Sequence, residues 1–517
     1  MTTTAFGQAP AETDDLHAVF DAGMATARAG LGHQQPFFIE GKPRDGAGTR
    51  QEWSPIDRDI VIGEFAQATA ADVDEAVDVS TAFAPTWGAT GWQERVDIVR
   101  RAADLMEARR GELAAISVLE TAKNRMEAFG EVDELIGLVR LNCEQVEENE
   151  GFRYRLPGDG SASNFMDVLC PYGVWGLISP FNFPLALAAN PVSAALLAGN
   201  CLVFKPAHQG VLTGLKIYEI FREAGIPAEA FHVVPGRGAV VGARIAGHPG
   251  IGGITFTGSY DVGMGIYRQR DSAPRPTICE LGGKNPSVVT DKADIAKAAE
   301  GVMHGAFGFG GQKCASNSRS YVQRSVYGEF VEQLRSMAED IVIGDPSERG
   351  VYLGPLINDA AGERYTTAVA EARASGTVLT GGETLTGGVH DRGNYVRPTV
   401  VEVPEDSWLF KRELFTPFIA VEPYDDLGDA IAKANDTEFG LTAGFFSEDP
   451  GEIDRFLDHI EAGVVYVNRR ASSTTGAWPG LQTFGGWKGS GTSGRSVGGR
   501  FYVSQYMREQ SRTVIAS

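Results

Sequence analysis

Cysteine is scarce in this sequence, with five residues in a chain of 517. Their number is odd and they lie far apart, which argues against a disulfide framework or a zinc cluster and predicts a reducing compartment. The N-terminal segment MTTTAFGQAPAETDD also lacks the basic and apolar regions of a secretion signal. We therefore expect a cytoplasmic protein that binds no metal.

Basic runs are absent as well. The chain has 46 lysines and arginines against 67 aspartates and glutamates, which gives a formal net charge of -21. A protein that binds nucleic acid needs a basic stripe to contact phosphates, so we expect no nucleic-acid partner. The acidity by itself indicates a soluble, self-repelling surface and does not identify a substrate.

One uncharged stretch, between Asp167 and Lys205, is long enough on paper to span a bilayer. Three prolines and three asparagines interrupt it, at positions 180, 184 and 191 and at positions 182, 190 and 200. A lipid-exposed helix tolerates such interruptions poorly, because the freed polar groups have no partners in lipid. The stretch is therefore predicted to be a buried strand, loop, helix and strand, and we expect no membrane partner.

The N-terminal third reads as mostly helical. A helix is expected near residues 14–29 and a short strand at 37–39. From about residue 70 to 148, apolar residues recur three or four positions apart, as in amphipathic helices. The segment 152–171 instead alternates polar and apolar residues around a Pro-Gly turn, which predicts a two-stranded excursion.

From residue 173, the short apolar runs GVWGLIS, CLVF, FHVV and GGITF alternate with helical stretches near 185–199, 212–224 and 238–247. This alternation predicts βαβ units and a parallel, doubly wound sheet. The 64 glycines of the chain, placed between apolar runs, fit the many tight turns of such a fold.

A second α/β series begins near Asn285 and continues to about residue 470. Helices are expected at 294–309 and 326–340, with a strand at 320–323 between them. The tail FYVSQYMREQSRTVIAS reads as an extended strand, which we expect to pair with another element or subunit. Two sheet domains are therefore predicted.

Three residues are candidates for chemistry. Cys314 lies in GFGGQKCAS, where glycines allow close approach of a bound molecule, and the neighbouring Lys313 is expected to lower the pKa of its thiol. Glu280 ends the apolar run PTICE, at the sheet edge where ligands bind, and suits a general base. Asn182, in SPFNFP, suits a donor to an oxyanion. Taken singly, each has an ordinary explanation: an inert core thiol, a strand-end ion pair and a helix cap.

The usual dinucleotide fingerprint, GxGxxG after an early strand, is absent. In its place, Lys205 ends a strand in FKPA, where its ammonium would reach ribose hydroxyls. FTGS, residues 256–259, leads into a helix whose N–H groups, together with Ser259, suit a pyrophosphate. Gly236 and Gly238 open another helix. Each of these signals is weak alone.

Seven motifs occur in order: PFNFP, FKPA, FTGS, ELGGKNP, GQKC, KRELFTP and FGGWKGSG. Together they resemble the aldehyde dehydrogenase superfamily, and the similarity extends from about residue 36 to the tail. The separation of Glu280 and Cys314, 314 − 280 = 34 positions, is typical of the hydrolytic members. The resemblance implies an aldehyde dehydrogenase-like α/β fold with a Rossmann-type NAD domain, an α/β catalytic domain and a small β oligomerisation flap.

The resemblance also implies domain boundaries. The NAD-binding domain would cover residues 1–151 and 172–282, and the catalytic domain residues 283–483. The flap would cover residues 152–171 and 484–517, and it implies a homodimer or a larger homo-oligomer.

The roles implied by the resemblance follow the motifs. Cys314 attacks the aldehyde, and the Asn182 amide with the Cys314 N–H holds the oxyanion of the thiohemiacetal. Hydride passes to NAD, with NADP left open, and Glu280 activates the water that hydrolyses the thioester. The implied cofactor-binding residues are Ser179, Pro180, Phe181, Lys205, Pro206, Gly238, Phe256, Thr257, Gly258, Ser259, Gly263, Leu281, Glu413 and Phe415. The implied substrate-binding residues are Ser316, Gly476, Ala477 and Phe484.

Within the superfamily, the segments PYGVWGLISPFNFPLAL and AFGFGGQKC resemble the 1-pyrroline-5-carboxylate (L-glutamate γ-semialdehyde) dehydrogenases. In that group a loop like Thr475-Gly476-Ala477 presents backbone N–H groups to the substrate carboxylate. The implied reaction is oxidation of the semialdehyde to glutamate, in proline degradation.

Some positions depart from these patterns. His208 replaces a glutamate that selects NAD in many members, and Thr416 replaces a glycine. Ala315 stands where the subgroup has serine directly after the cysteine. An aliphatic or aromatic aldehyde dehydrogenase therefore stays an alternative, favoured if Trp478 contributes to an apolar mouth.

Two further classes compete with this interpretation. A cysteine hydrolase or acyltransferase would need a histidine base beside Cys314, and His304 lies on a predicted helix with no reason to face the thiol. A non-catalytic protein built on this fold would not need Cys314, Glu280 and Asn182 together.

Overall fold

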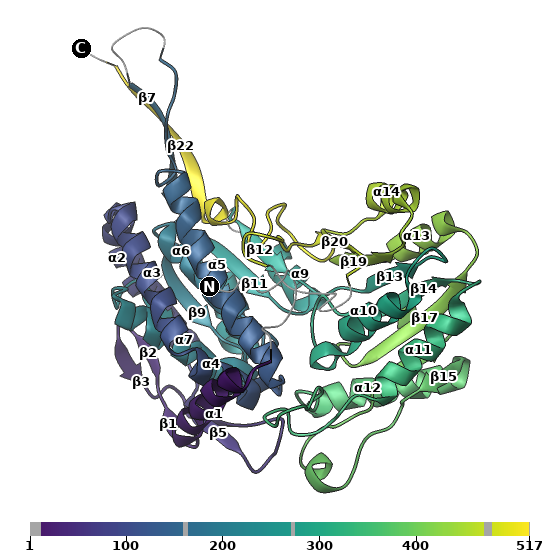
Figure 1. The fold of residues 1–517 in the computed structure, drawn as a ribbon. Coiled ribbons are helices and arrows are strands. Elements are labelled where there is room, and N and C mark those ends of the chain that lie inside the picture. The colour runs from purple at the N-terminus through teal and green to yellow at the C-terminus, as the bar shows by residue number, and fades with distance from the viewer. Residues whose placement is uncertain (1–11, 159–163, 270–273, 470–477, 516–517) are drawn as a thin grey trace.

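Two seven-stranded sheets carry most of the chain in the computed structural model, one in each lobe of the molecule (Figure 1). The structure describes residues 12–158, 164–269, 274–469 and 478–515. The strands of the first sheet lie between residues 37 and 280, and those of the second between residues 285 and 467. The two α/β series predicted from the sequence are therefore confirmed.

The first sheet has the order β12-β11-β8-β9-β10-β2-β3. Strands β8 to β12 are parallel to one another, and β2 and β3 run antiparallel to their neighbours at one edge. The bounds are β2 Phe37–Ile39, β3 Lys42–Arg44, β8 Val174–Ile178, β9 Cys201–Lys205, β10 Phe231–Val233, β11 Gly253–Thr257 and β12 Thr277–Glu280. The parallel part is the predicted doubly wound sheet.

Helices lie on both faces of this sheet, because alternate residues of its strands face two separate cores. Trp175 and Leu177 of β8 belong to the core that contains helix α6 (Ala186–Leu197). Val174 and Ile178 belong to the core of the opposite face. The remaining helices of this lobe are α1 Asp14–Ala29, α2 Ala70–Ala89, α3 Trp92–Ala108, α4 Arg110–Thr121, α5 Arg125–Glu148, α7 Val211–Ala224, α8 Ala243–Gly247 and α9 Tyr260–Arg268.

The uncharged stretch of the sequence contains α6, and every residue of this helix except Leu187 is buried. Its polar side chains find partners inside the protein, since Asn142 of α5 donates to Asn190 Oδ1 (2.9 Å) and to Ser193 Oγ (2.9 Å). A helix surrounded by protein on all sides needs no charged face. Among the described residues, no helix combines the length and the apolar character that crossing a bilayer requires.

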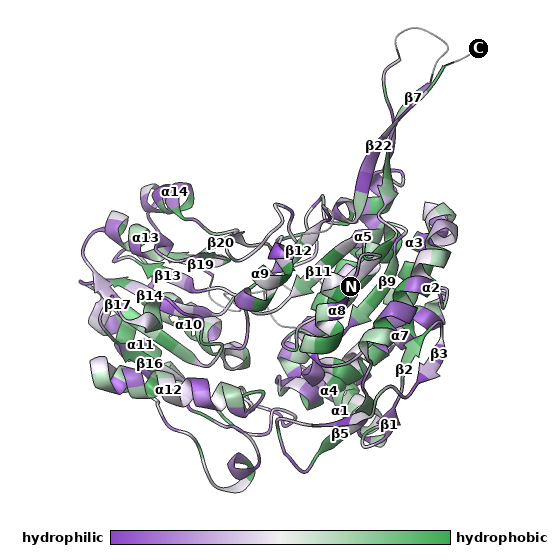
Figure 2. Cartoon of the chain, turned by 180° about the vertical axis from the view of Figure 1, so that it is seen from behind, coloured by the Kyte–Doolittle hydropathy of each residue, from purple (hydrophilic) through white to green (hydrophobic). Residues whose placement is uncertain are grey.

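The second sheet has the order β15-β16-β17-β14-β13-β19-β20, parallel except for the β15–β16 pair. Its strands are β13 Asn285–Val289, β14 Asn317–Gln323, β15 Thr377–Thr380, β16 Thr399–Glu402, β17 Phe418–Tyr424, β19 Thr442–Phe446 and β20 Val464–Val467. Its helices are α10 Ile295–Phe307, α11 Tyr327–Glu339, α12 Asp359–Ser375, α13 Leu427–Asn435 and α14 Pro450–His459. Figure 2 shows apolar residues concentrated on the strands inside each lobe.

A long antiparallel ribbon projects from the first lobe (Figure 1). Strand β7 (Asn164–Pro171) pairs with β6 (Arg153–Arg155) on one side and with the C-terminal strand β22 (Met507–Val514) on the other. The sequence-based prediction of a two-stranded excursion that meets the tail is confirmed. Two small sheets complete the fold: β1 Gln34–Gln35, β5 Val61–Ala66 and β4 Thr49–Trp53 in one, and β18 Phe439–Gly440 with β21 Trp487–Lys488 in the other.

The domain boundaries stay a prediction. Residues 484–506, which the sequence analysis groups with the flap, do not join the ribbon. Phe484, Val503 and Tyr506 are buried in the core of the first lobe. We therefore propose that the C-terminal part of the flap begins at Met507.

Candidate active site

The carboxyl ends of β8, β9, β11 and β12 of the first sheet meet the segments that precede β14 and β17 of the second sheet at a cavity of about 980 Å³. The carboxyl ends of parallel strands are where open α/β sheets bind ligands. Lys205 at the end of β9 and Glu280 at the end of β12 line the cavity from the first lobe, and Cys314 and Glu413 line it from the second. The sequence-predicted residues that line it are Ser179, Pro180, Phe181, Asn182, Lys205, Gly238, Phe256, Thr257, Gly258, Ser259, Glu280, Leu281, Cys314, Glu413 and Phe415.

The backbone around Cys314 is held by the side chain of Asn285, at the start of β13. Asn285 Nδ2 donates to the carbonyl of Cys314 (2.7 Å) and to the carbonyl of Ser316 (2.9 Å). Burial raises the pKa of the Cys314 thiol, and the carboxyl groups of Glu413 and Glu280 raise it further. In the free cavity the thiol therefore keeps its proton at neutral pH.

The prediction that Lys313 lowers the pKa of Cys314 is wrong. Lys313 Nζ pairs with Glu127 Oε1 of α5 at 2.9 Å, and the pKa of the Cys314 thiol is raised, not lowered.

Two glycines allow Glu413 and the Cys314 backbone to pack closely against the segment that follows Glu280. A Cβ added to Gly282 would lie 2.3 Å from Glu413 Oε2, and one added to Gly283 would lie 2.7 Å from the carbonyl oxygen of Cys314. The N–H of Gly283 donates to Glu413 Oε1 (3.0 Å). The Gly-Gly pair after Glu280 is thus required by close approach of Glu413 on one side and Cys314 on the other.

Glu280 is a buried carboxyl group whose Oε2 has no hydrogen-bond partner among the described residues. Oε2 therefore makes none of the contacts expected of a strand-end ion pair. Burial raises the pKa of Glu280 to about 8. A carboxyl group that titrates near neutral pH and faces a cavity is suited to accept a proton from water or a thiol.

Asn182 is buried at the cavity and does not cap helix α6, the ordinary explanation considered for it from the sequence. The N-cap residue of α6 is Leu185, which makes no side-chain cap bond. The carboxylate of Glu131 accepts hydrogen bonds from the N–H groups of Leu185 (2.8 Å) and Ala186 (3.3 Å) instead. The Asn182 amide is thereby left available to the cavity.

The other end of the cavity has the groups that a dinucleotide needs. Ser259 is the N-cap residue of α9 and its side chain makes no cap bond, so the first N–H groups of α9 remain available to a pyrophosphate. Lys205 Nζ has the carbonyl of Pro206 as a partner (3.1 Å), and burial with the nearby Arg50 lowers the pKa of Lys205 to about 8. The rings of Phe181 and Phe415 meet edge to face, with centroids 5.9 Å apart. These residues fit NAD.

His208 stands at the position where many family members have a glutamate that selects NAD. In this structure the carboxylate of Glu52 lies near the His208 ring. Its Nδ1 is 4.0 Å from Glu52 Oε1, on β4. Burial, followed by the charge of Lys205, lowers the pKa of His208 to about 4, so the ring is neutral at physiological pH.

Six predicted residues do not line this cavity in the described structure. Gly263 lies behind it, where a Cβ would lie 2.2 Å from Leu281 Cδ2, and Pro206 contributes its carbonyl to Lys205. Phe484 is buried in the core of the first lobe. Ser316 is buried, and its Oγ has no partner among the described residues. Gly476 and Ala477 lie outside the described residues.

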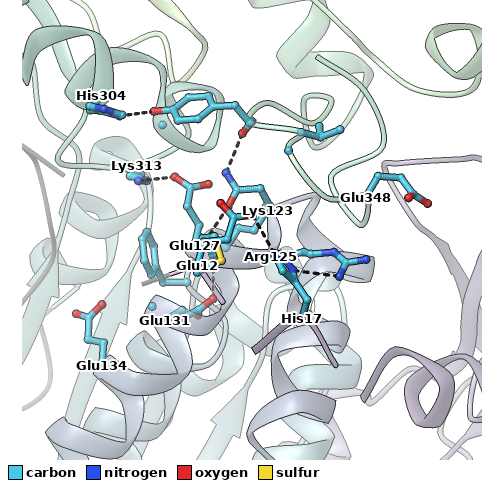
Figure 3. Close-up of a pocket in the computed structure, with 18 of the residues that line it drawn as sticks. Glu12, His17, Lys123, Arg125, Glu127, Glu131, Glu134, His304, Lys313 and Glu348 are labelled. Atoms are coloured by element: carbon cyan, nitrogen blue, oxygen red, sulfur yellow. Dashed lines mark hydrogen bonds and ion pairs between the residues drawn. The ribbon is translucent and has the colours of Figure 1, made fainter. Parts of the chain in front are cut away.

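A second cavity, of about 350 Å³, is shown in Figure 3. Phe183, which follows Asn182, and Lys313, which precedes Cys314, line this second cavity. Asn182 and Cys314 themselves line the first cavity. The segments that carry Asn182 and Cys314 therefore contribute residues to both cavities. Trp478 contributes to the second cavity, which also contains many charged side chains. These are Glu12, His17, Lys123, Arg125, Glu127, Glu131, Glu134, His304, Lys313 and Glu348.

His304 lines this second cavity, where its Nδ1 lies 3.0 Å from the hydroxyl of Tyr352 (Figure 3). Burial lowers the pKa of His304. The ring thus has a partner other than the thiol, as expected if it is not the base of a cysteine hydrolase.

The sequence analysis missed several residues of the site. Arg364 of α12 lines the first cavity and acts electrostatically on Glu413, and no motif marked its helix. Lys284 also acts electrostatically on Glu413. Its side chain is buried, and its Nζ has no hydrogen-bond partner among the described residues. Lys123 and Glu131, behind Asn182, occur in an ordinary helical pattern. The signal for Lys284, Lys123 and Glu131 was that these charged residues are buried, and burial is not visible in one sequence.

Residues 44–512 match the model of the aldehyde dehydrogenase family. The chain is 32% identical over 503 residues to 1-pyrroline-5-carboxylate dehydrogenase 1 of Halalkalibacterium halodurans, covering 96% of this chain and 95% of that protein. It is 36% identical over 452 residues to α-ketoglutaric semialdehyde dehydrogenase of Bacillus subtilis, covering 86% and 90%. A crystal structure of 1-pyrroline-5-carboxylate dehydrogenase from Thermus with bound NAD superposes with a TM-score of 0.92 at 30% identity, covering 99% of this chain and 100% of that one.

The raised pKa of Cys314 predicts how the free protein reacts with iodoacetamide. The rate of alkylation at Cys314 will still be increasing with pH at pH 9, because only the thiolate reacts and its formation is disfavoured by burial. Lys313→Met will leave this profile in place, since Lys313 pairs with Glu127. Peptide mass mapping measures the rate, with Cys314→Ser as the control for the other cysteines. A rate that levels off below pH 8 would contradict the assignment.

Proposed function

This chain belongs to the aldehyde dehydrogenase family, and from that premise we propose that it oxidises an aldehyde to a carboxylic acid by covalent catalysis at Cys314. It is an NAD(P)-dependent aldehyde dehydrogenase with the fold of that family. One observation supports the proposal above the others. Cys314, Glu280 and Asn182 lie at one cavity that also carries the groups for a dinucleotide.

Cys314 attacks the aldehyde carbon, and its thiol loses a proton as the carbon–sulfur bond forms. Because burial disfavours a free thiolate in this cavity, the proton needs an acceptor at hand. Water in the cavity is the acceptor we assign for this step, and Glu280, with a pKa of about 8, acts in the hydrolysis that follows. The product is a thiohemiacetal whose oxygen carries negative charge.

The Asn182 amide and the N–H of Cys314 stabilise that oxygen. Donors fixed in a buried site act strongly on a developing charge, and loss of one such donor costs about 10²–10³-fold in rate. NAD, when bound, supplies the hydride acceptor that converts the thiohemiacetal into a thioester. Glu280 then takes a proton from water, which attacks the thioester carbon and releases the acid and the thiol.

The dinucleotide is held by residues of both lobes in this proposal. Lys205 contacts the adenosine ribose, and Ser259 with the first turn of α9 contacts the pyrophosphate. Glu413 contacts the nicotinamide ribose, and Phe415 packs alongside. Gly263 and Pro206 support this arrangement from behind the cavity wall.

The substrate we propose is L-glutamate γ-semialdehyde, which is oxidised to glutamate in proline catabolism. Support comes from the similarity to the 1-pyrroline-5-carboxylate dehydrogenases. Ser316, Gly476, Ala477 and Phe484 stay the proposed substrate contacts.

A second candidate is a semialdehyde without an α-amino group. The similarity to an α-ketoglutaric semialdehyde dehydrogenase favours it, and so does Ala315, which supplies no hydroxyl beside the cysteine. An apolar aldehyde is a further candidate, because Trp478 and Phe183 line the second cavity and most of the surface that this cavity exposes is apolar.

We also propose that the protein is a homo-oligomer assembled through the projecting ribbon of β6, β7 and β22. The outer strands β6 and β22 leave unpaired backbone groups that a second copy can pair.

The five cysteines are all free, in line with the reducing cytoplasm expected from the sequence.

Cys314→Ser tests the nucleophile. A serine hydroxyl is a much poorer nucleophile than a thiolate, so formation of NADH from the aldehyde will decrease on the order of 10³-fold or more. Binding of NAD, followed by quenching of tryptophan fluorescence, will change little. Turnover at the wild-type rate would overturn the assignment of Cys314.

Glu280→Gln separates the two halves of the reaction. The amide cannot accept a proton from water, so steady-state turnover will decrease about 10²–10⁴-fold. Stopped-flow absorbance at 340 nm will show one burst of NADH of up to one equivalent per active site, followed by a stall. Sustained turnover without a burst would show that Glu280 is not the base for deacylation.

A substrate screen tests the proposed specificity. Pyrroline-5-carboxylate, α-ketoglutarate semialdehyde, hexanal and benzaldehyde are compared by kcat/KM with NAD and with NADP. We expect the highest value for pyrroline-5-carboxylate with NAD. Activity confined to hexanal and benzaldehyde would contradict the proposed substrate and leave the family assignment intact.

A further inference from the structure

A buried ion pair lies behind Asn182, and no step of the proposed reaction uses it. Lys123 Nζ and Glu131 Oε2 are 2.6 Å apart, and both side chains have 0% exposure. Glu131 is on α5, and Lys123 is in the short segment between α4 and α5. Removing two charges from water costs more free energy than the pair often returns, and apolar residues of similar volume are frequently as stable. The pair therefore calls for an explanation other than stability.

Lys123 contacts the two chain segments that carry the reacting groups. Its Nζ donates to the backbone carbonyl of Asn182. The same ammonium lies 4.2 Å from the ring centroid of Phe183 and 4.7 Å from that of Phe309. Phe183 follows Asn182, and Phe309 lies in the turn that leads to Cys314. The buried Lys123 ammonium thus binds the backbone of Asn182 and also contacts the turn that leads to Cys314.

Glu131 fixes the other end of the Asn182 segment. Its Oε1 accepts hydrogen bonds from the N–H of Leu185 (2.8 Å) and of Ala186 (3.3 Å), where α6 begins without a side-chain cap. Its Oε2 also accepts from Ser117 Oγ of α4 (2.9 Å). Lys123 and Glu131 therefore attach residues 182 to 186 to helices α4 and α5 at two points.

We propose that Lys123 and Glu131 are positioning residues that orient the Asn182 amide toward the oxyanion formed at Cys314. The inference rests on the proposed role of Asn182. A displacement of about 1 Å in an oriented group costs roughly 10²-fold in rate, so a rigid attachment of this backbone has a catalytic effect. The charges are suited to this task because a charge-assisted hydrogen bond in a dry interior is strong and directional.

Glu120 supplies a matched control. It is also a buried carboxylate that accepts backbone N–H groups at the start of a helix, from Leu212 (2.8 Å) and Thr213 (2.9 Å) of α7. It lies on α4, as Ser117 does, yet it contacts no part of the Asn182 segment in the hydrogen bonds of the described residues. Glu120→Gln thus reports what loss of a buried helix-capping charge does by itself.

The test is a double-mutant cycle on the rate of the NADH burst, with the best aldehyde of the substrate screen. Lys123→Met and Glu131→Gln are each made in the wild-type protein and in an Asn182→Ala background. We expect Lys123→Met to slow the burst about 10–100-fold in the wild-type protein, with NAD affinity within about twofold. In the Asn182→Ala background the same change will slow it by less than about threefold, because the amide that it positions is gone.

Glu120→Gln should leave the burst rate within about threefold of the wild type. The positioning role would be overturned if Lys123→Met slowed the burst by the same factor in the wild-type and Asn182→Ala proteins. It would also be overturned if Lys123→Met left the burst rate of the wild-type protein unchanged. If Lys123→Met does not fold, Glu131→Gln decides by the same comparison, since glutamine keeps the shape and an acceptor for the N–H groups. A burst unaffected by Asn182→Ala alone would overturn the role of Asn182 and this inference with it.

Discussion

Loss of hydration shifts the pKa values of four ionisable groups that line the cavity, Cys314, Glu280, Glu413 and Lys205. It raises the pKa of the Cys314 thiol, and it raises the pKa of Glu280 to about 8 and that of Glu413 to about 7. It lowers the pKa of Lys205 to about 8. The free site thus favours neutral groups, and the charge appears as the reaction proceeds. In a site of low dielectric constant, a fixed donor then acts on that charge far more strongly than it would in water.

The scaffold meets this constraint with fixed backbone contacts. Asn285 holds the carbonyls of Cys314 and Ser316, and the Gly282–Gly283 pair lets Glu413 and Cys314 approach from opposite sides. The Asn182 segment is attached to α5 through Lys123 and Glu131. Hydrogen bonds and aromatic rings surround the two charges of this fully buried pair, which offsets their lost hydration.

Much of this arrangement could be predicted from the sequence. Apolar runs such as CLVF and the helical stretches between them predicted two successive α/β series, and ordered motifs located Cys314, Glu280 and Asn182. The expectation for Lys313 was wrong because Lys313 pairs with Glu127 and burial raises the pKa of Cys314. Lys123, Lys284 and Arg364 escaped notice because their importance comes from burial and from long-range contacts, which one sequence does not reveal. Residues 484–506 were grouped with the tail because a glycine-rich segment gives no periodicity to place it in a core.

The central claim is that the aldehyde becomes a thioester on Cys314 before it is released as the acid. The direct measurement is peptide mass mapping of the protein quenched in acid during the first turnover at pH 6. At that pH Glu280, with a pKa near 8, is mostly protonated and hydrolysis is slow. The account predicts one acyl group on the peptide that contains Cys314 and none on the other cysteine peptides. Release of the acid with no acyl group on Cys314, or an acyl group on another residue, would contradict it.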